Sequence, residues 1–209
     1  FEVSKLEEAT AKRYLPAAEL SKLKSATASN PQCEYARKLF LFSYYCYGIS
    51  FIDMAMLTTA HIKQMEDGDY IVYKRQKIKR QKGVKPISIK ITPAIRQLIG
   101  SLQAASPTVD DFLLPIVTRS GYTGERLYMH IRTRYSKYQK YLRLLAEELG
   151  IDFHLTSYVS RHTAAMTLQR NHIPREVISQ MLGHADLETT NIYLDSFDNE
   201  VINEAAKVL

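Results

Sequence analysis

The sequence is poor in cysteine and has no long uninterrupted apolar run. Its two cysteines, Cys33 and Cys46, do not form a CxxC pair, which argues against a disulfide framework and against a cysteine-bound zinc ion. The charged start of the chain has no apolar signal region, and serine, glycine and aspartate interrupt the most apolar stretch, residues 39–56. We therefore expect no membrane span, no metal site and a reducing, cytoplasmic setting.

The balance of charge favours a polyanionic partner. Lys and Arg number 28 against 22 Asp and Glu, a formal net charge of +6. With 209 residues, 45% of them hydrophobic, the chain is long enough for one sizeable core, and we expect a single domain. Phe1 is not an initiator methionine, so we expect an N-terminal portion to be missing and residues 1–15 to be a linker into the domain.

Capping residues and prolines divide the sequence into a mainly helical pattern. We expect helices over residues 16–24, 31–46, 51–57, 93–102 and 126–149, and a surface loop over 106–124. Alternating apolar residues predict a hairpin of strands 62–64 and 70–73 around the turn Asp67-Gly68, with 87–91 as a third strand. The sequence therefore predicts an α+β fold, mainly α-helical, with a small three-stranded antiparallel sheet.

The C-terminal part predicts three short helical segments. Thr156 is expected to cap a helix over 157–170, and Gly183 to end a helix over 174–182 that opens on a proline. A further helix or turn then carries Tyr193.

Three polar motifs follow one another along these segments. They are Arg161-His162, then Leu182-Gly183-His184, then Tyr193 nine positions after that histidine. Each is common as a structural feature. The ordered set, with helix ends at the fitting places, resembles the C-terminal signature of the tyrosine recombinases, also called the phage integrase family, and in particular integrases of bacterial mobile elements. The resemblance covers nearly the whole chain. It implies the catalytic fold of that family and site-specific DNA recombinase or integrase activity.

The resemblance implies DNA cleavage and rejoining through a 3′-phosphotyrosyl intermediate, without metal or cofactor. Tyr193 would be the nucleophile. Arg161 offers a planar fork of donors to two phosphate oxygens, and His184 would donate to the same oxygens or assist the proton transfer of the tyrosine. The family also has a lysine between its second and third strands, often as Arg-x-Lys. Arg75-Gln-Lys77 matches, so Lys77 would be the general acid toward the leaving 5′-oxygen.

One residue of the family pattern is missing. The first catalytic arginine usually ends a Gly-hydrophobic-Arg motif, but Gly48-Ile49-Ser50 ends on serine, and Tyr47 stands where some relatives have an arginine. Either another cation replaces it, with Arg37 or Lys38 the nearest in sequence, or the chain is a weak, altered or inactivated enzyme. Loss of one such charge typically costs about 10²–10³ in rate.

Tyr158, where the family often has histidine, is a further candidate catalytic residue. It either donates to phosphate or orients Arg161, or it is a partly buried tyrosine. Three other residues have expected supporting roles. Ser50 and Asp53 are expected to form a capping box, with Asp53 also bracing a neighbouring catalytic group. His162 is expected to brace the fold.

The resemblance also predicts double-stranded DNA at a specific recombination site as the partner. The expected DNA contacts are Lys74, Arg75, Lys79, Arg80, Lys82, Arg132 and Arg134. Two alternatives stay open: the basic hairpin only touches the DNA backbone, and the tyrosines of helix 126–149 are core residues instead of DNA contacts.

The family implies a homo-tetramer on DNA, a monomer in isolation and possible DNA-bending accessory proteins. An amphipathic helix over 196–209 would dock on a neighbouring protomer or fold back on its own domain. The missing N-terminal portion would be a DNA-binding domain. Two other functions stay open at this point: a non-catalytic or impaired DNA-binding module of the same fold, and a type IB topoisomerase-like nicking and closing enzyme.

Overall fold

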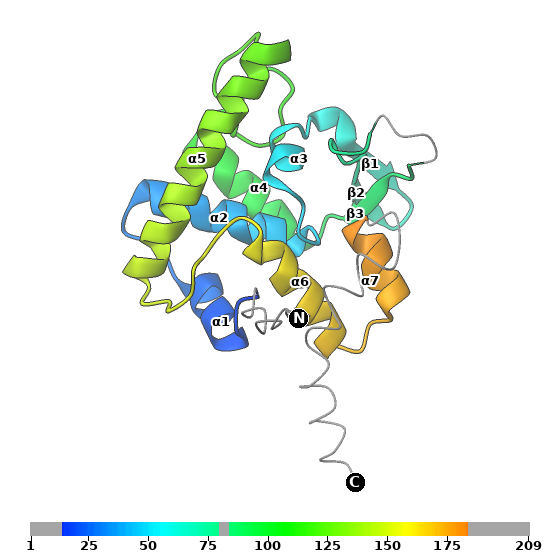
Figure 1. Cartoon of the computed structure of the whole chain (residues 1–209). Coiled ribbons are helices and arrows are strands. Elements are labelled where there is room, and N and C mark those ends of the chain that lie inside the picture. The colour runs from blue at the N-terminus through cyan, green and yellow to red at the C-terminus, as the bar shows by residue number, and fades with distance from the viewer. Residues whose placement is uncertain (1–13, 80–83, 184–209) are drawn as a thin grey trace, which may run out of the picture.

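The computed structural model describes residues 14–79 and 84–183 (Figure 1). The segments expected to carry His184, Tyr193 and the terminal helix 196–209 lie outside these residues, as do Arg80 and Lys82. The described part is mainly helical with one antiparallel sheet, as predicted. Its elements are α1 (Ala17–Ser25), α2 (Pro31–Tyr45), α3 (Phe51–Ala55), the 3-10 turn η1 (Thr59–His61), β1 (Ile62–Met65), β2 (Gly68–Tyr73), β3 (Ile87–Lys90), α4 (Pro93–Ala105), α5 (Gly124–Glu148), α6 (Val159–Arg170) and α7 (Arg175–Leu182).

Helix α2 is the centre of the helical body. It packs against α1, α4, α5 and α6, and Leu39, Phe40 and Phe42 on it are 0% exposed. The three-stranded sheet lies to one side of this body, with α7 against β3 (Figure 1). Burial of these large side chains supplies most of the driving force for assembling the helices.

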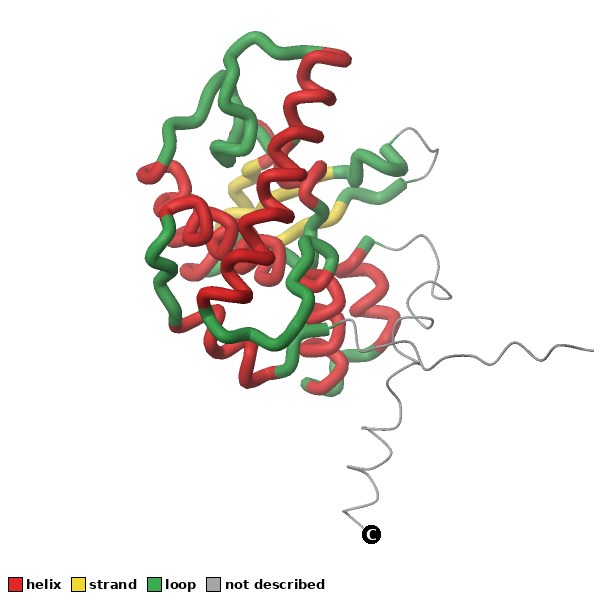
Figure 2. The backbone as a smooth tube through the Cα atoms, turned by 60° about the vertical axis from the view of Figure 1, so that its left-hand side comes forward, coloured by secondary structure: helices red, strands yellow, loops and turns green. Residues whose placement is uncertain are grey.

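The sheet has the order β1-β2-β3, with both pairs antiparallel. Ile71 of β2 pairs with Ile89 of β3, and both are completely buried, which fixes the register because a slip by one residue would turn both outward. The hairpin turn is Glu66-Asp67, one residue earlier than predicted, since Met65 already pairs with Gly68. Beyond β2 the chain projects away from the helical body (Figure 2).

Most helix starts agree with the capping residues read from the sequence. The Asn30 side chain accepts from the backbone N–H groups of Gln32 and Cys33, and the Thr92 side chain accepts from Ile95. The start of α6 was predicted wrongly. The helix begins at Val159, not at 157, without a side-chain cap, because residues 156–159 form a separate turn in which Val159 donates to the Thr156 carbonyl.

Candidate active site

Arg161 lies on α6 with its guanidinium inside the protein. The residue is 6% exposed, Nη1 donates to the Gly48 carbonyl at 3.1 Å, and Nη2 donates to the Leu182 carbonyl at 2.6 Å. The acceptors belong to the segment before α3 and to the end of α7, so Arg161 joins three parts of the chain. Burial, together with the positive charge of Arg75, lowers the pKa of Arg161 to about 10, and the guanidinium is therefore charged at neutral pH.

Gly48 allows this close approach. Its φ of +72° lies in the left-handed region, and a Cβ at this position would overlap the Cα, Cβ and Cγ of Arg161. The glycine is therefore required twice, once by its backbone conformation and once by the space that Arg161 occupies.

Arg75 follows β2 and brings a second guanidinium to the same place. Its Nη1 donates to the Gly183 carbonyl at 3.1 Å. The consecutive carbonyls of Leu182 and Gly183 thus accept from Arg161 and Arg75 respectively. Two positive side chains from different parts of the chain are therefore held next to each other. The carbonyls that hold them belong to the two residues immediately before His184.

Gly183 ends α7 in the left-handed conformation, with a φ of +63°, as the sequence predicted. A Cβ at this position would overlap the side chain of Ile87 on β3 and lie 3.3 Å from Cδ of Arg75. Glycine is therefore required at this position by its backbone conformation and by the close approach of β3.

Asp53 links α3 to the hairpin that carries Arg75 and Lys77. The residue is 3% exposed, and its Oδ1 accepts from the Gln76 backbone N–H at 2.7 Å. Its Oδ2 accepts from the Ser50 hydroxyl at 2.6 Å. Ser50 also caps α3 by accepting from the Asp53 N–H, as predicted. The other half of the predicted capping box, a bond from the Ser50 backbone N–H to the Asp53 carboxylate, is replaced by the bonds of this carboxylate to the Ser50 hydroxyl and to Gln76.

Lys77 lies in the turn that begins at Arg75, where the Ile78 N–H donates to the Arg75 carbonyl at 3.1 Å. Its side chain is exposed, as are those of Lys74 and Lys79. Because Asp53 bonds to Gln76, the residues on either side of Gln76 are tied to the buried part of the site. Arg75 points inward from this anchor, whereas Lys77 is exposed to solvent.

Tyr158 and His162 lie beside Arg161 at the start of α6. Tyr158 is 50% exposed, and its ring meets the His162 ring edge to face at a centroid distance of 4.7 Å. His162 is buried, at 6% exposure, and its bracing role stays a prediction. Tyr158 is thus half exposed, and its role as a donor to phosphate stays a prediction.

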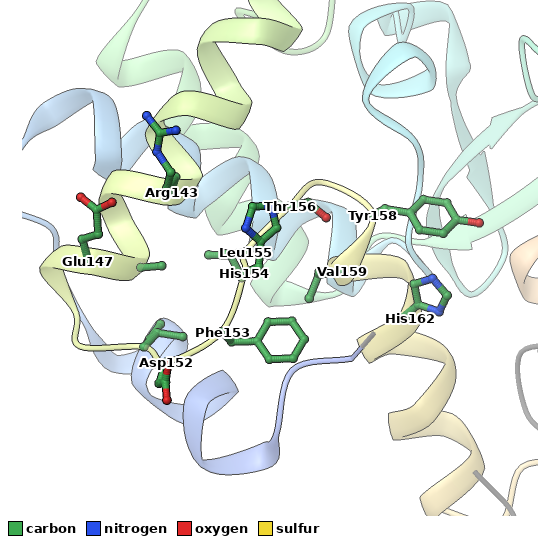
Figure 3. Close-up of a pocket in the computed structure, with 12 residues that line it drawn as sticks. Arg143, Glu147, Asp152, Phe153, His154, Leu155, Thr156, Tyr158, Val159 and His162 are labelled. Carbon is green, nitrogen blue, oxygen red and sulfur yellow. The ribbon is translucent and has the colours of Figure 1, made fainter. Parts of the chain in front are cut away.

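A cavity of about 760 Å³ lies between α5 and the segment before α6, lined by Arg143, Phe153, His154 and His162 among others. Figure 3 shows the Tyr158 side chain at its edge, pointing away from Phe153 and His154. Tyr158 and His162 both line this cavity.

Arg37 has a position of its own, on the first half of α2. It donates to both carboxylate oxygens of Glu34 at 2.7 Å and to the Leu23 carbonyl at 2.8 Å. Lys38 lies 3.9 Å from the same carboxylate. These bonds balance the charge of Arg37 and explain its burial without any role in the candidate site.

The expected DNA contacts on α5 differ in how far they are exposed to solvent. Arg132 is exposed, whereas Arg134 is partly buried with its guanidinium 5.9 Å from the centre of the Tyr35 ring. Tyr138 is 4% exposed and stacks on Phe51, so this tyrosine is a core residue. Tyr128, at 58% exposure, faces solvent. The helix thus contributes to the core with one face and offers a basic, partly aromatic face outward.

Sequence reasoning placed Arg75 among the DNA contacts and did not find its proximity to Arg161. The signal was present in part. Arg75 stands two residues after the buried Tyr73 that ends β2, so a short loop leaves it little freedom to move from the sheet edge. That α7 packs against this edge is a tertiary contact that no local pattern indicates.

Comparisons with known proteins show which family this fold belongs to. A model of the phage integrase family matches residues 13–200. The tyrosine recombinase XerD of Halalkalibacterium halodurans is 43% identical over 54 residues, which cover 26% of this chain and 18% of that protein. The tyrosine recombinase XerC of Rhodospirillum centenum is 31% identical over 114 residues, 54% of this chain and 31% of that protein.

Two solved structures share the fold. One is the XerH site-specific recombinase bound to a palindromic difH substrate in a post-cleavage complex, with a TM-score of 0.64 and 20% identity, covering 99% of this chain and 56% of that chain. The other is the Tn1549 transposon integrase in complex with transposon right end DNA, with a TM-score of 0.61 and 15% identity, covering 98% and 70%. The chain belongs to the phage integrase family. Its matches span less than a third of the length of the curated relatives named above.

Among residues 14–79 and 84–183, no group of three or more His, Cys, Asp or Glu side chains is arranged to hold a metal ion. Within the same residues no helix is both long and apolar enough to cross a membrane.

Proposed function

We propose that this chain is the catalytic domain of a site-specific DNA recombinase or integrase of a mobile element. The observation that carries the proposal is the buried Arg161, charged and pinned by the Leu182 carbonyl two residues before His184. A buried charge is costly unless it has a partner or a function. A phosphodiester is the partner that matches the planar fork of donors.

In the proposed reaction the Tyr193 hydroxyl oxygen attacks a DNA phosphorus in line. A phosphorus–oxygen bond to the tyrosine forms and the bond to the 5′-oxygen breaks, which leaves a 3′-phosphotyrosine and a free 5′-hydroxyl. Arg161 and His184 donate to the non-bridging oxygens, whose charge grows in the transition state. The exposed Lys77 gives the leaving oxygen its proton, and the phenol proton of Tyr193 passes to water. Because the reverse reaction restores the phosphodiester, religation needs no cofactor.

The proposed partner is double-stranded DNA. The net charge of +6 and the exposed Lys74, Lys79 and Arg132 suit contacts with the DNA backbone. Relatives solved with a difH substrate or with transposon DNA lend support to DNA as the partner. We also propose the assembly that the family implies, a tetramer on DNA made from monomers, with helix 196–209 docking on a neighbouring protomer or on its own domain.

The alternative is a DNA-binding module of the same fold that cleaves slowly or not at all. It is favoured by one observation: the side chain of Ser50, at the position of the missing first arginine, is engaged in capping α3 and in bonding Asp53. A topoisomerase-like enzyme is a third candidate, because it would use the same chemistry without choosing a site.

A pool of duplexes that carry a nick near the cleavage position and random sequence around it separates the three. After cleavage the short strand next to the nick is lost, so the covalent adduct cannot be religated and is seen on a denaturing gel. A recombinase gives adducts enriched in one sequence, and a topoisomerase gives adducts on most sequences. A binding module retains DNA on a filter without forming adducts. Tyr193→Phe is the control, and adducts that persist in it would refute the proposed nucleophile.

A further inference from the structure

The missing first arginine leaves a question that the geometry around Arg161 addresses. We infer that Arg75 supplies the second guanidinium of the phosphate site, in place of the arginine that Ser50 replaces. The inference rests on the proposed function for its reaction, but its anion-binding part can be tested without cleavage.

Arg75 and Arg161 lie next to each other. Arg161 and Arg75 donate to the carbonyls of Leu182 and Gly183, at 2.6 and 3.1 Å. Carbonyls of consecutive residues are only a few ångströms apart, so the two guanidiniums are neighbours. Each uses only part of its five N–H donors in these bonds, which leaves donors for a ligand oxygen.

Arg75 and Arg161 carry the same charge at short range and therefore repel each other. The positive charge of Arg75 is, after burial, a cause of the lowered pKa of Arg161. Within the described residues neither guanidinium has a carboxylate within ion-pair distance. Asp53 acts on Arg161 only at longer range, with its oxygens bonded to Ser50 and Gln76. A pair of like charges held together by backbone carbonyls is a suitable site for an anion, because the anion relieves the repulsion.

Arg75 is also held in a fixed position. The Gln76 N–H is bonded to Asp53, and the side chain of Arg75 packs against Gly183, so Arg75 is held from both ends. A preorganised donor does not have to be reoriented when charge develops on a phosphate oxygen. Arg37 and its neighbour Lys38, on the helix before Ser50, are poorer substitutes. The Glu34 carboxylate already accepts from Arg37 and lies within ion-pair distance of Lys38.

The test uses the 209-residue chain in three variants. Arg75→Gln removes the charge at similar size, and Arg75→Lys keeps the charge but loses the planar fork. Arg96→Gln is the matched control, because Arg96 is an exposed arginine paired with Asp69 near the start of β2, whereas Arg75 follows the end of that strand. Urea unfolding of each variant first establishes that it is folded.

Two readouts are measured. The first is the single-turnover rate of adduct formation on a nicked duplex at saturating protein. We expect Arg75→Gln to be slower by about 10²–10³, Arg75→Lys to be intermediate and Arg96→Gln to equal the wild type. The second is the rise in melting temperature on adding inorganic phosphate or orthovanadate. We expect the rise in the wild type and in Arg96→Gln, and its loss in Arg75→Gln.

The outcomes distinguish the two proposals. If Arg75→Gln keeps the wild-type cleavage rate, or if the anion stabilises it as much as the wild type, the inference is wrong even when the recombinase proposal stands. The inference is also wrong if the wild type is not stabilised by either anion. If stabilisation requires Arg75 but the wild type forms no adduct on any duplex, the anion site stands and the proposed enzymatic function fails.

Discussion

Replacement of Gly48 by alanine tests whether the packing of Arg161 against the segment before α3 holds the site together. The added Cβ would overlap the backbone and side chain of Arg161, and the alanine would have to adopt a φ of +72°. We expect the variant to fold less stably and to form DNA adducts more slowly, because the Gly48 carbonyl that accepts from Arg161 must move.

Two terms contribute to the loss of stability. The left-handed conformation costs an L residue about 1–2 kcal/mol. Forcing an extra carbon into a packed interior costs about 1–3 kcal/mol more, since the atoms it meets include backbone, which cannot rotate away. The expected loss in the free energy of unfolding is therefore about 2–5 kcal/mol.

Gly121 is the matched control because it has the same φ of +72° and no atom within 4 Å of a Cβ built on it. Gly121→Ala therefore shows the conformational term alone, and the difference between the two variants measures the contact with Arg161. Urea unfolding, with the slope checked for two-state behaviour, gives both values. Equal losses in the two variants would refute the account of how Arg161 is packed.

Three other predictions concern charge. Adding Ser50→Arg to Arg75→Gln should raise the single-turnover cleavage rate above that of Arg75→Gln alone, because it returns a guanidinium near Arg161; no gain would contradict the shared role. Burial tends to raise the pKa of Glu34, but hydrogen bonds from Arg37 and the Ala28 N–H outweigh it and hold the pKa below its usual value. The stability that the Arg37–Glu34 pair contributes should be complete above the usual pKa of a glutamate and lost as pH falls through the lowered pKa. Arg37→Met should lower the free energy of unfolding in urea by about 3 kcal/mol and make it depend less on pH in the acid range. An unchanged dependence on acid pH in Arg37→Met would count against the pair. Burial and then Arg134, Arg119 and Lys137 lower the pKa of His130, whose Nε2 accepts from the Thr118 N–H. Protonation of His130 therefore opposes the folded state. The contribution of neutral His130 to stability should be complete above the usual pKa of 6.5 and be lost as pH falls below it. An NMR titration of His130 at or above that value would contradict this.

Local sequence signals predicted the helices and strands well because caps and turns are short-range effects. Asn30, Thr92 and Gly183 end or begin their helices as expected, and the alternation around Ile71 and Ile89 fixes the sheet. The start of α6 was missed because the turn at Thr156 uses backbone bonds, which leave no mark on residue choice. The bond from the Thr58 N–H to the His61 ring was missed because nothing in the sequence named a partner for that histidine.

The site was only partly predictable, and the reason is distance along the chain. A motif can indicate that Arg161 and Lys77 have functions, but not that Arg75 reaches the end of α7, which depends on how α7 packs on β3. Asp53 shows the same limit. Its place near the start of α3 was readable, whereas its bond to Gln76 joins residues 23 positions apart.

The central claim is that a tyrosine near the end of the chain becomes esterified to DNA. The most direct measurement is a peptide map of the adduct trapped on a nicked duplex, in which protease and nuclease digestion leave a nucleotide on the modified residue for mass spectrometry. The account predicts the nucleotide on Tyr193 through its phenol oxygen. A nucleotide on any other side chain, or an adduct of equal yield in Tyr193→Phe, would contradict it.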